Sequence, residues 1–450
     1  MPKITIVGAG QAGLQLGLGL LGNGYDVTVV SNRTPEQIAG GRVTSSQCMF
    51  DSSLAHERSL GIEFWGAEAP PVEGIALTVP APPDASPAPP DGKAFSWRGQ
   101  LAAPAQSVDQ RVKMPRWMSE FSSRGGNLVI EDASVPSLEK YAADSDLVIV
   151  AAGKGEIADL FTRDAERSVF DAPQRSLALT YLHGLTPRSG PSAVDFNLIP
   201  GVGEYFVFPA LTINGPCHIQ TWEAVPGGPM DAFSSSATPA EHLATSKELL
   251  RTFLPWEYGR VTEAELTDEN GILAGRFAPT VRKPVATLPS GAHVLGLGDV
   301  VVLNDPITGQ GSNNAAKCAA SYLASILAHG DAPFDEAFMQ KTFETYWEYA
   351  SAVTTWTSAM LGAPPPHVLQ LLGAAAEHQA IADRFANAFN NPPDFFDWFM
   401  DPALAEKYLA EVTAPPAPEP SAPGASEAAP GASEAAPPKR GFWSRLRRRA

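Results

Sequence analysis

Cysteine is scarce in this chain of 450 residues, which contains only Cys48, Cys217 and Cys318. Three thiols cannot all pair within one chain and none forms a CxxC unit, so we expect no disulfide framework. The eight histidines show no HxxxH or HExxH spacing, which argues against a metal site. Reduced cysteines are typical of the cytoplasm, which is the location we expect.

Basic residues are outnumbered, and long apolar runs are lacking. The chain has 32 Lys and Arg against 49 Asp and Glu, a net charge of -17. We expect no nucleic-acid binding, because phosphate contacts need a basic surface. No run of about 18 apolar residues occurs, so we expect no transmembrane helix. The apolar start of the chain lacks the basic region and cleavage pattern of a secretory signal.

The first 30 residues show the pattern strand, glycine turn, helix, strand. Lys3–Val7 and residues 25–30 are short apolar runs, with a predicted helix over 11–21 between them. Further buried strands are predicted at 146–151 and 293–297. This order is typical of a parallel α/β sheet.

Later segments have other patterns. Residues 165–285 contain alternating apolar stretches that suit an antiparallel sheet, and residues 80–92 are a Pro-rich loop. Residues 310–412 are predicted to be helical, most strongly over 335–361 and 366–388.

The composition changes sharply near the end of the chain. Residues 413–438 are almost entirely Pro, Ala, Ser, Glu and Gly, which predicts a disordered linker. Residues 439–450 hold six Lys or Arg and no acidic residue. This basic tail suits docking on an acidic partner or an anionic membrane, and it equally suits a plain solvated end.

The sequence IVGAGQAG has the GxGxxG spacing directly after a predicted strand. Gly8 permits a tight turn, Gly10 lets the backbone approach a pyrophosphate, and Gly13 allows the helix to contact the strand. The helix that follows points its N–H groups at the phosphates. We predict that Gly8, Gly10, Gln11, Ala12 and Gly13 bind a dinucleotide.

The acidic residue that usually ends the second strand of such folds is missing. It would bind the ribose hydroxyls, and this chain has Val30, Ser31, Asn32 and Arg33 there. The adenosine end should therefore be held less tightly, as suits a nucleotide that arrives and leaves as a substrate. Alternatively, Ser31 or Asn32 takes over the role of the carboxylate.

A second signature, GLGDVVVLNDPITGQGSNNAA, occupies residues 296–316. Asp299 follows a predicted strand and suits hydrogen bonds from ribityl hydroxyls. A helix opening at Gly311 offers N–H donors to the negative N1–O2 edge of a reduced isoalloxazine. The alternative is an ordinary strand, turn and helix capped by aspartate, but the two signatures together favour FAD over NAD. The predicted contacts are Gly298, Asp299, Pro306, Gly309, Gln310, Gly311, Ser312 and Asn313.

These motifs resemble the FAD-binding fold of the aromatic hydroxylases. From the N-terminus to about Pro402, the chain more closely resembles the styrene and indole monooxygenases, through LAAPAQSVDQRV, DLVIVAAGKG and RFANAFNNP. The resemblance implies an α/β fold: a Rossmann-like FAD-binding domain with an inserted mixed-sheet substrate domain and C-terminal helices. The expected division is an FAD-binding domain at 1–60, 106–164 and 286–330, a substrate domain at 61–105 and 165–285, and a helical region at 331–412.

The resemblance also implies the activity. Such enzymes are oxygenase components that use reduced FAD as a diffusible co-substrate, and they epoxidise indole or related aryl alkenes such as styrene through a flavin C4a-hydroperoxide. The implied partners are an NADH-dependent flavin reductase, O₂ and a small aromatic substrate, with a homodimer as a further expectation. DLVIVAAGKG lacks the DGxxS-type segment associated with NAD(P)H use. The alternatives are a single-component NAD(P)H-dependent aromatic hydroxylase and a non-catalytic flavin-binding protein.

Several site residues are implied by the same resemblance. Arg42, Asp109 and Arg111 would lie near the flavin. Indole-type members carry Ser-x-Gln-x-Met after this arginine where styrene-type members carry Asn-x-Val-x-His, and the chain has the indole-type pattern. The expected catalytic group is Ser45, Ser46 and Gln47, with Ser45 or Gln47 bonding the hydroperoxide or the indole N–H. The expected substrate pocket consists of Met49, Val72, Ile75, Ala105 and Pro306.

Overall fold

The computed structural model describes residues 2–414, apart from positions 83, 85, 88, 154 and 331. The described residues up to Val412 form one compact unit. The predicted linker begins inside a helix, because α12 runs to Thr413, and the rest of the linker from position 415 and the basic tail lie outside the described residues. Among the described residues, no helix combines the length and apolar character that crossing a bilayer requires.

The first sheet confirms the strands predicted from the apolar runs. Its six strands lie in the order β14-β15-β6-β1-β2-β5, and all neighbours are parallel except β14 and β15. The strands are β1 (Lys3–Val7), β2 (Asp26–Ser31), β5 (Asn127–Ile130), β6 (Leu147–Val150), β14 (Val285–Thr287) and β15 (His293–Gly296). Since β1 and β6 are buried along nearly their whole length, they show the continuous apolar runs of a covered parallel sheet.

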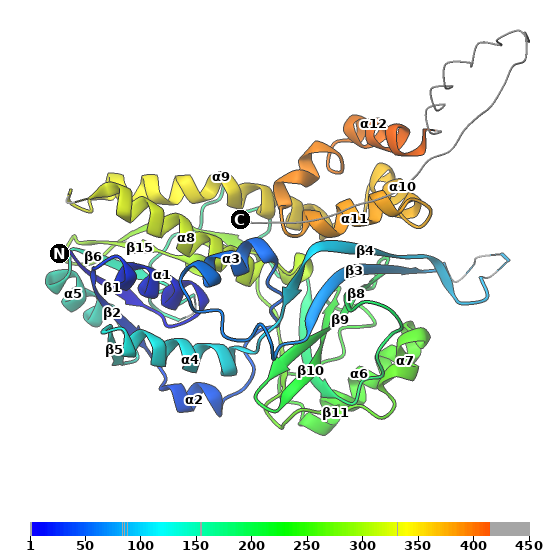
Figure 1. Cartoon of the computed structure of the whole chain (residues 1–450), viewed down its shortest axis with the longest axis horizontal. Helices are drawn as coiled ribbons and strands as arrows, with labels where there is room; N and C mark the ends of the chain where they lie inside the picture. The colour runs from blue at the N-terminus through cyan, green and yellow to red at the C-terminus, as the bar shows by residue number, and fades with distance from the viewer. Residues whose placement is uncertain are drawn as a thin grey trace, which may run out of the picture. The chain divides into compact units, whose positions relative to one another are not determined.

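Helices pack around this sheet (Figure 1). α1 packs against β2, α4 and α8, and α8 packs against α9. Buried residues of these helices and of the strands form one large apolar core. The helices are α1 (Gln11–Gly22), α2 (Pro35–Ala39), α3 (Asp51–Ser59), α4 (Gln110–Ser123), α5 (Val135–Asp144), α8 (Gly311–His329) and α9 (Glu336–Met360).

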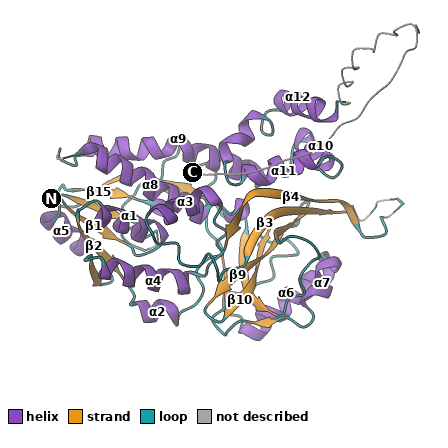
Figure 2. Cartoon of the chain, in the orientation of Figure 1, coloured by secondary structure: helices purple, strands orange, loops and turns teal. Residues whose placement is uncertain are grey.

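The second sheet has eight strands, seven of them in the order β11-β7-β10-β9-β8-β3-β4, with β12 beside β7 (Figure 2). The antiparallel arrangement predicted for residues 165–285 holds for every pair among β7 to β12, and the sheet becomes mixed where β3, outside that segment, pairs parallel with β8. Two helices within the same segment, α6 (Pro239–Phe253) and α7 (Pro255–Val261), were not predicted. The strands are β3 (Pro71–Pro80), β4 (Lys93–Gln106), β7 (Ser176–His183), β8 (Ala193–Ile199), β9 (Gly203–Thr212), β10 (Gly215–Ala224), β11 (Glu265–Leu266) and β12 (Ile272–Gly275).

Short elements link the two sheets to the flanking helices. β13 (Thr280–Val281) pairs with β16 (Val302–Leu303) in a separate two-stranded sheet. Two 3-10 turns follow β15, namely η1 (Gly298–Val300) and η2 (Pro306–Thr308).

The single helical stretch predicted over 366–388 is two helices. α10 (Pro366–Ala374) and α11 (Gln379–Ala388) are separated by an extended residue, His378. The break lets α11 lie against β4, so closely that a Cβ on Gly99 would be 2.0 Å from the Ala382 carbonyl oxygen. η3 (Pro392–Asp397) and α12 (Pro402–Thr413) complete this region, whose apolar core also includes Trp97 of β4.

Candidate active site

The helices that follow the two glycine-bearing segments begin at the same end of the molecule. Gln15 Nε2 of α1 donates to the carbonyl of Ala316 in α8 at 2.8 Å. One turn further on, a Cβ on Gly19 would be 2.6 Å from the Leu323 side chain. Both contacts advance in the same direction along the two helices, so α1 and α8 run parallel and their N-termini are neighbours.

The first glycine turn, residues 8–13, fits a pyrophosphate. Gly8 has a φ of +125°, and a Cβ there would be 2.6 Å from the Ala151 backbone carbon. A Cβ on Gly13 would be 2.0 Å from the Gly8 carbonyl oxygen, so helix and strand meet backbone to backbone. Gly10 differs, because a Cβ on it would meet nothing within 4 Å, and α1 has no side-chain cap there. Open space before uncapped N–H groups is what a phosphate needs.

The second glycine turn, residues 305–311, fits the polar edge of a flavin. Asp305 Oδ1 accepts from the Ile307 N–H at 3.1 Å and starts η2. Gly309 is left-handed, with φ +62°, and a Cβ on Gly309 or Gly311 would meet nothing within 4 Å. α8 begins at Gly311 without a side-chain cap. Its positive end therefore faces open space, which suits the negative edge of reduced FAD.

The first glycine turn meets the segment that leads from β15 toward the second glycine turn. A Cβ on Gly298 would lie 3.2 Å from the Ala12 side chain, although the residues are far apart in the sequence. Asp299 has an exposed side chain and lies beside the loop that follows β6, since a Cβ on Gly153 would be 3.2 Å from its Cβ. The residues present thus fit FAD, with the carboxyl ends of β1, β6 and β15 beneath it.

At the end of β2, a serine replaces the usual carboxylate. The Ser31 hydroxyl donates to the Arg33 carbonyl at 2.7 Å and accepts from the Arg33 N–H at 3.3 Å. Asn32 is exposed. The serine is occupied within its own turn, which leaves no anionic group at this position for ribose hydroxyls.

Asn313 connects the second glycine turn to the predicted pocket segment. Its Oδ1 accepts from the Phe50 N–H at 2.9 Å, and its Nδ2 donates to the Cys48 carbonyl at 2.9 Å. Its side chain therefore holds residues 48–50 in place, whereas Ser312 is half-buried at the start of α8. The Gln310 side chain is buried and donates to the Phe389 carbonyl at 3.0 Å.

Ser45 and Gln47 belong to one hydrogen-bonded group. Ser45 Oγ donates to Gln47 Oε1 at 2.9 Å and accepts from Gln110 Nε2 at 3.0 Å. Gln47 Nε2 donates to the Val108 carbonyl. Tyr181, which sequence reasoning missed, donates its hydroxyl to the Ser45 carbonyl at 2.9 Å. Half-buried Ser46 lies within the same segment.

Three of the five predicted pocket residues share one apolar cluster beside this group. Val72, Ile75 and Ala105 are buried there with Tyr181 from the second sheet. Tyr181 thus belongs to both the polar group and the apolar cluster. The cluster consists of Val43, Cys48, Phe50, Val72, Ile75, Leu101, Ala105, Tyr181, Phe208, Ala210, Cys217, Ile219 and Ala386.

Met49 and Pro306 lie outside this apolar cluster. Met49 packs with Leu54 and Ala316, and its sulfur accepts from Lys113 Nζ at 3.2 Å. Pro306 is half-buried at the start of η2.

Met49 contacts a buried ion pair that the sequence did not reveal. Lys113 Nζ lies 2.7 Å from Glu57 Oε1, and both side chains are at most 2% exposed. The same oxygen accepts from Gln11 Nε2 at 3.0 Å, so the predicted nucleotide contact Gln11 uses its side chain inside the protein. The network fixes the start of α1 against α3 and α4.

Asp109 and Arg111 join the two sheets through protein contacts. Arg111 pairs with Asp109 at 2.8 Å and with Asp268 at 2.9 Å, and it donates to Thr212 at 3.1 Å. Burial lowers the pKa of Arg111, but its bonds to the Asp268 and Asp109 carboxylates outweigh this effect and raise that pKa above its usual value. Arg42 is exposed, and its charge acts on His242 of α6, whose pKa is lowered to about 4, mainly by burial.

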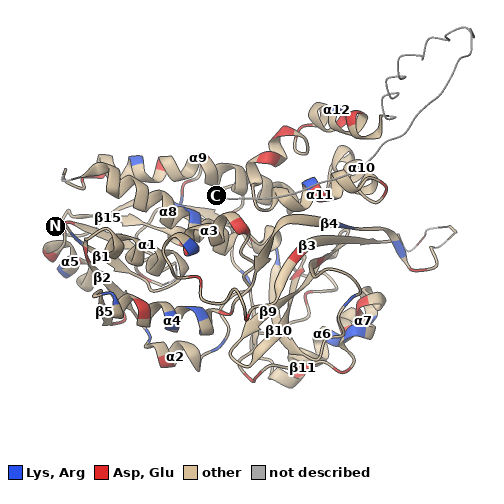
Figure 3. Ribbon diagram, viewed as in Figure 1, with Lys and Arg blue, Asp and Glu red and all other residues tan. Residues whose placement is uncertain are grey.

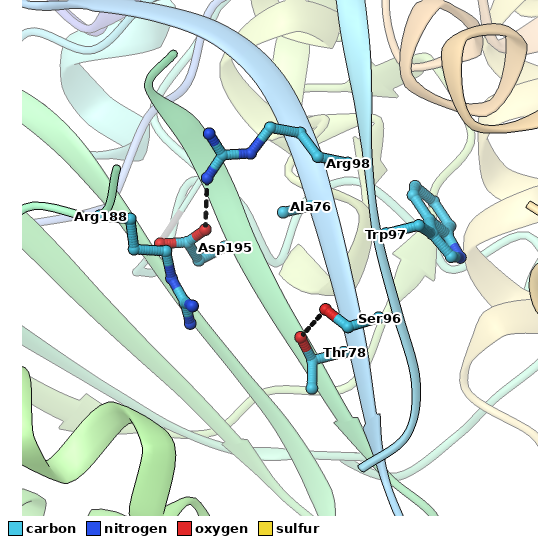
Figure 4. A pocket seen from close by; sticks show the side chains of 7 residues that line it. All are labelled: Ala76, Thr78, Ser96, Trp97, Arg98, Arg188 and Asp195. Atoms are coloured by element: carbon cyan, nitrogen blue, oxygen red, sulfur yellow. Dashed lines mark hydrogen bonds and ion pairs between the residues drawn. The ribbon is translucent and has the colours of Figure 1, made fainter. Parts of the chain in front are cut away.

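A separate cavity of about 110 Å³ lies on the other face of the second sheet (Figure 4). Thr78 lines the cavity, whereas Leu77, the preceding residue of β3, points into a core on the opposite face of the sheet. In this cavity, Arg98 and Arg188 lie on either side of Asp195. Acidic and basic residues are also neighbours on α7 (Figure 3). Because this polar cavity and the apolar cluster lie on opposite faces, it is not the candidate site. Within the described part of the chain, no group of three or more His, Cys, Asp or Glu could hold a metal ion.

Comparison with solved structures shows the fold. A flavoprotein/dehydrogenase from Cytophaga hutchinsonii superposes with a TM-score of 0.63 at 12% identity, over 91% of this chain and 99% of that one. A triple mutant of the flavin-dependent brominase Bmp2 gives a TM-score of 0.59 at 14% identity, with the same coverage. The predicted FAD-binding fold of the aromatic-hydroxylase type is confirmed.

Comparison of sequences shows the family. Residues 153–260 match the model described as "Styrene monooxygenase A putative substrate binding domain". The chain is 31% identical to styrene monooxygenase StyA of Pseudomonas fluorescens over 410 residues, 89% of this chain and 95% of that protein. It is 30% identical to StyA of a Pseudomonas species over 419 residues, 91% of this chain and 98% of that protein. The chain therefore belongs to the styrene monooxygenase family and is an FAD-dependent monooxygenase.

Proposed function

We propose that this chain is the oxygenase of a two-component system that epoxidises indole or a related aryl alkene such as styrene. FAD arrives already reduced by a separate NADH-dependent flavin reductase. The observation that carries the proposal is the pair of neighbouring helix N-termini, α1 and α8, each preceded by an open glycine turn, with Asn313 of α8 bound to the segment that borders the apolar cluster.

The proposed role of each residue follows from where it lies in the site. The first glycine turn and the start of α8 hold FAD, and Asp299 accepts from its ribityl hydroxyls. When bound, reduced FAD supplies the activation of O₂ and the transfer of one oxygen atom. The apolar cluster binds the aromatic ring and excludes water, and it holds the alkene in one orientation for the transfer.

Indole is the substrate that the polar group beside the cluster supports best. Gln47 is buried, and its Nε2 is fixed by the Val108 carbonyl. Its Oε1 accepts one hydrogen bond from Ser45 and retains a second acceptor position. An indole N–H fits that position, whereas styrene has no such donor. Met49 has a supporting role, because it packs against Leu54 and Ala316 and so anchors the segment that carries Gln47.

Turnover by the purified chain without a reductase tests this function. Chemically reduced FAD, O₂ and catalase are mixed with indole in one reaction and with styrene in another. We expect indole to give a blue pigment after spontaneous oxidation of its epoxide, and styrene to give styrene oxide. Oxidation of FAD without any oxygenated product from either substrate would contradict the proposal.

The remaining features are proposals of the same kind. We propose a cytoplasmic enzyme that acts as a homodimer, with the FAD-binding and substrate domains divided as the sequence predicts. The basic tail, with six Lys or Arg and no acidic residue over 439–450, makes an acidic reductase or an anionic membrane a suitable partner for this end of the chain.

A further inference from the structure

Glu223 is a fully buried carboxyl group that the proposed function leaves without a role. It lies on β10 opposite Glu204 of β9 and has no exposed surface. Within the described residues, neither of its carboxyl oxygens receives a hydrogen bond from a donor. An ionised carboxylate buried without a donor is strongly disfavoured, so the group should keep its proton.

A second buried carboxyl group lies against it. Asp305 is 2% exposed, and its side chain lies close enough to Glu223 for each carboxyl group to affect the pKa of the other. Asp305 already accepts from the Ile307 N–H, so it is placed as the ionised member. One proton on Glu223 then satisfies both groups, because its O–H donates to the Asp305 carboxylate.

The other charged groups around Glu223 are paired with each other. Arg175, just before β7, forms a bidentate ion pair with Glu204 at 2.7 and 2.9 Å. Asp305 therefore carries the charge beside Glu223 that no ion pair offsets. Burial, Asp305 and Glu204 raise the pKa of Glu223 well above its usual value, while Arg175 opposes them.

The contact joins two functional parts of the molecule. Asp305 begins the second glycine turn, whereas Glu223 belongs to the second sheet. We propose that Glu223 is a positioning residue whose protonated carboxyl group donates a hydrogen bond to Asp305 and holds the second glycine turn against the second sheet. The consequence for flavin binding rests on the proposed function, whereas the contact itself is a property of the flavin-free protein.

The pH dependence of unfolding of the flavin-free full chain tests the contact. Glu223→Gln keeps an N–H donor for Asp305 but cannot titrate. Because the pKa of Glu223 is raised by folding, the folded wild type binds more protons than the unfolded chain and loses stability as pH rises above the ordinary carboxyl pKa. We expect the unfolding constant of the wild type, relative to Glu223→Gln, to rise by up to tenfold per pH unit in that window.

Two further variants separate this contact from general effects. Asp305→Asn removes the neighbouring charge, so it should weaken the same pH dependence, whereas burial of Glu223 should preserve part of it until Glu223→Gln is added in the double variant. Glu248→Gln is the matched control, because Glu248 is exposed on α6 and pairs with Arg251. It should keep the wild-type slope.

Infrared spectroscopy and flavin kinetics give independent readouts. A carboxylic-acid C=O band at neutral pH should be present in the wild type and absent from Glu223→Gln. The KM for reduced FAD should rise at alkaline pH in the wild type and stay level in Glu223→Gln. If wild type and Glu223→Gln show the same pH dependence of unfolding and the same infrared band, the proposed contact is wrong. If the KM for reduced FAD rises equally in both proteins at alkaline pH, the contact does not hold the second glycine turn. Absence of oxygenated product in all variants would instead refute the proposed function.

Discussion

Gly10 shows how one missing side chain makes room for a cofactor. A Cβ at this position would meet no protein atom within 4 Å, so the free protein does not need a glycine there for packing. At the uncapped start of a helix, a glycine that the fold does not require points to a ligand that approaches the backbone closely.

Gly10→Ala should therefore weaken flavin binding without weakening the fold. We expect the KM for reduced FAD to rise by about tenfold, because the added methyl group occupies space that the bound FAD needs. Thermal unfolding of the flavin-free protein should stay within a degree or two of the wild type, about the effect of a neutral surface change. Gly22→Ala in the same helix, also with open space around it, is the control and should leave the KM unchanged.

Gln47 carries the proposed preference for indole. Gln47→Val removes the acceptor for the indole N–H, and one lost hydrogen bond is worth about 1 kcal/mol. We expect kcat/KM for indole to fall between about fivefold and tenfold, with a smaller change for styrene. The ratio of the two rates, measured in one competition assay, checks this. Gln174→Val, at a half-buried glutamine whose side chain donates to the Ala172 carbonyl, should leave the ratio unchanged, and an equal loss for both substrates would contradict the assignment.

At the scale of elements, the contact between β4 and α11 depends on Gly99. A Cβ there would be 2.0 Å from the Ala382 carbonyl oxygen, so Gly99→Ala must push α11 away. We expect a loss of about 2 kcal/mol in unfolding free energy, in the usual range for overpacking. Chemical denaturation measures the loss, and Gly259→Ala, which has open space around it, provides the control. Equal stability of the two variants would show that α11 does not press on β4.

α8 carries a half-buried amine that gives the fold a pH signature. Burial lowers the pKa of Lys317 to about 8, and its Nζ donates to the Asn390 carbonyl at 3.3 Å. Between that value and the unfolded value of 10.5, the unfolded chain binds more protons, so stability should rise with pH. Lys317→Met should remove this rise. A wild type and variant with parallel stability curves above pH 8 would contradict the lowered pKa.

Local patterns predicted the elements whose causes are local. β1, α1 and β15 follow from apolar runs bounded by glycines, and both glycine turns follow from conformations or close contacts that only glycine allows. The break between α10 and α11 could not be predicted, because it serves a contact with a strand about 280 residues earlier. The parallel pairing of β3 with β8 likewise joins segments about 120 residues apart.

The same distinction separates the predicted site residues from the missed ones. Val72, Ile75 and Ala105 came from a family pattern, and the structure gathers them in one cluster. Tyr181 and Glu223 had no signal, because each is one residue of an ordinary strand whose partner lies in another part of the chain. Met49 came from the same family pattern, which does not tell on which side of the segment a side chain packs.

At the scale of the whole molecule, the compact unit that ends at Val412 holds every residue of the candidate site. A chain truncated after residue 412 should therefore fold and turn over chemically supplied reduced FAD at the full-length rate. With a reductase as the only source of reduced FAD, the truncated chain should be slower if the basic tail contacts that partner. Loss of activity with supplied reduced FAD would show that residues beyond 412 belong to the catalytic unit.

The central claim is that two open glycine turns bind an FAD that comes in reduced, since no carboxylate anchors its ribose at the end of β2. Anaerobic titration of the purified chain with reduced and with oxidised FAD tests it most directly. We predict one site per chain that binds reduced FAD more tightly than oxidised FAD and is weakened by Gly10→Ala. Protein that purifies with stoichiometric oxidised FAD and bleaches it with NADH alone would contradict the claim.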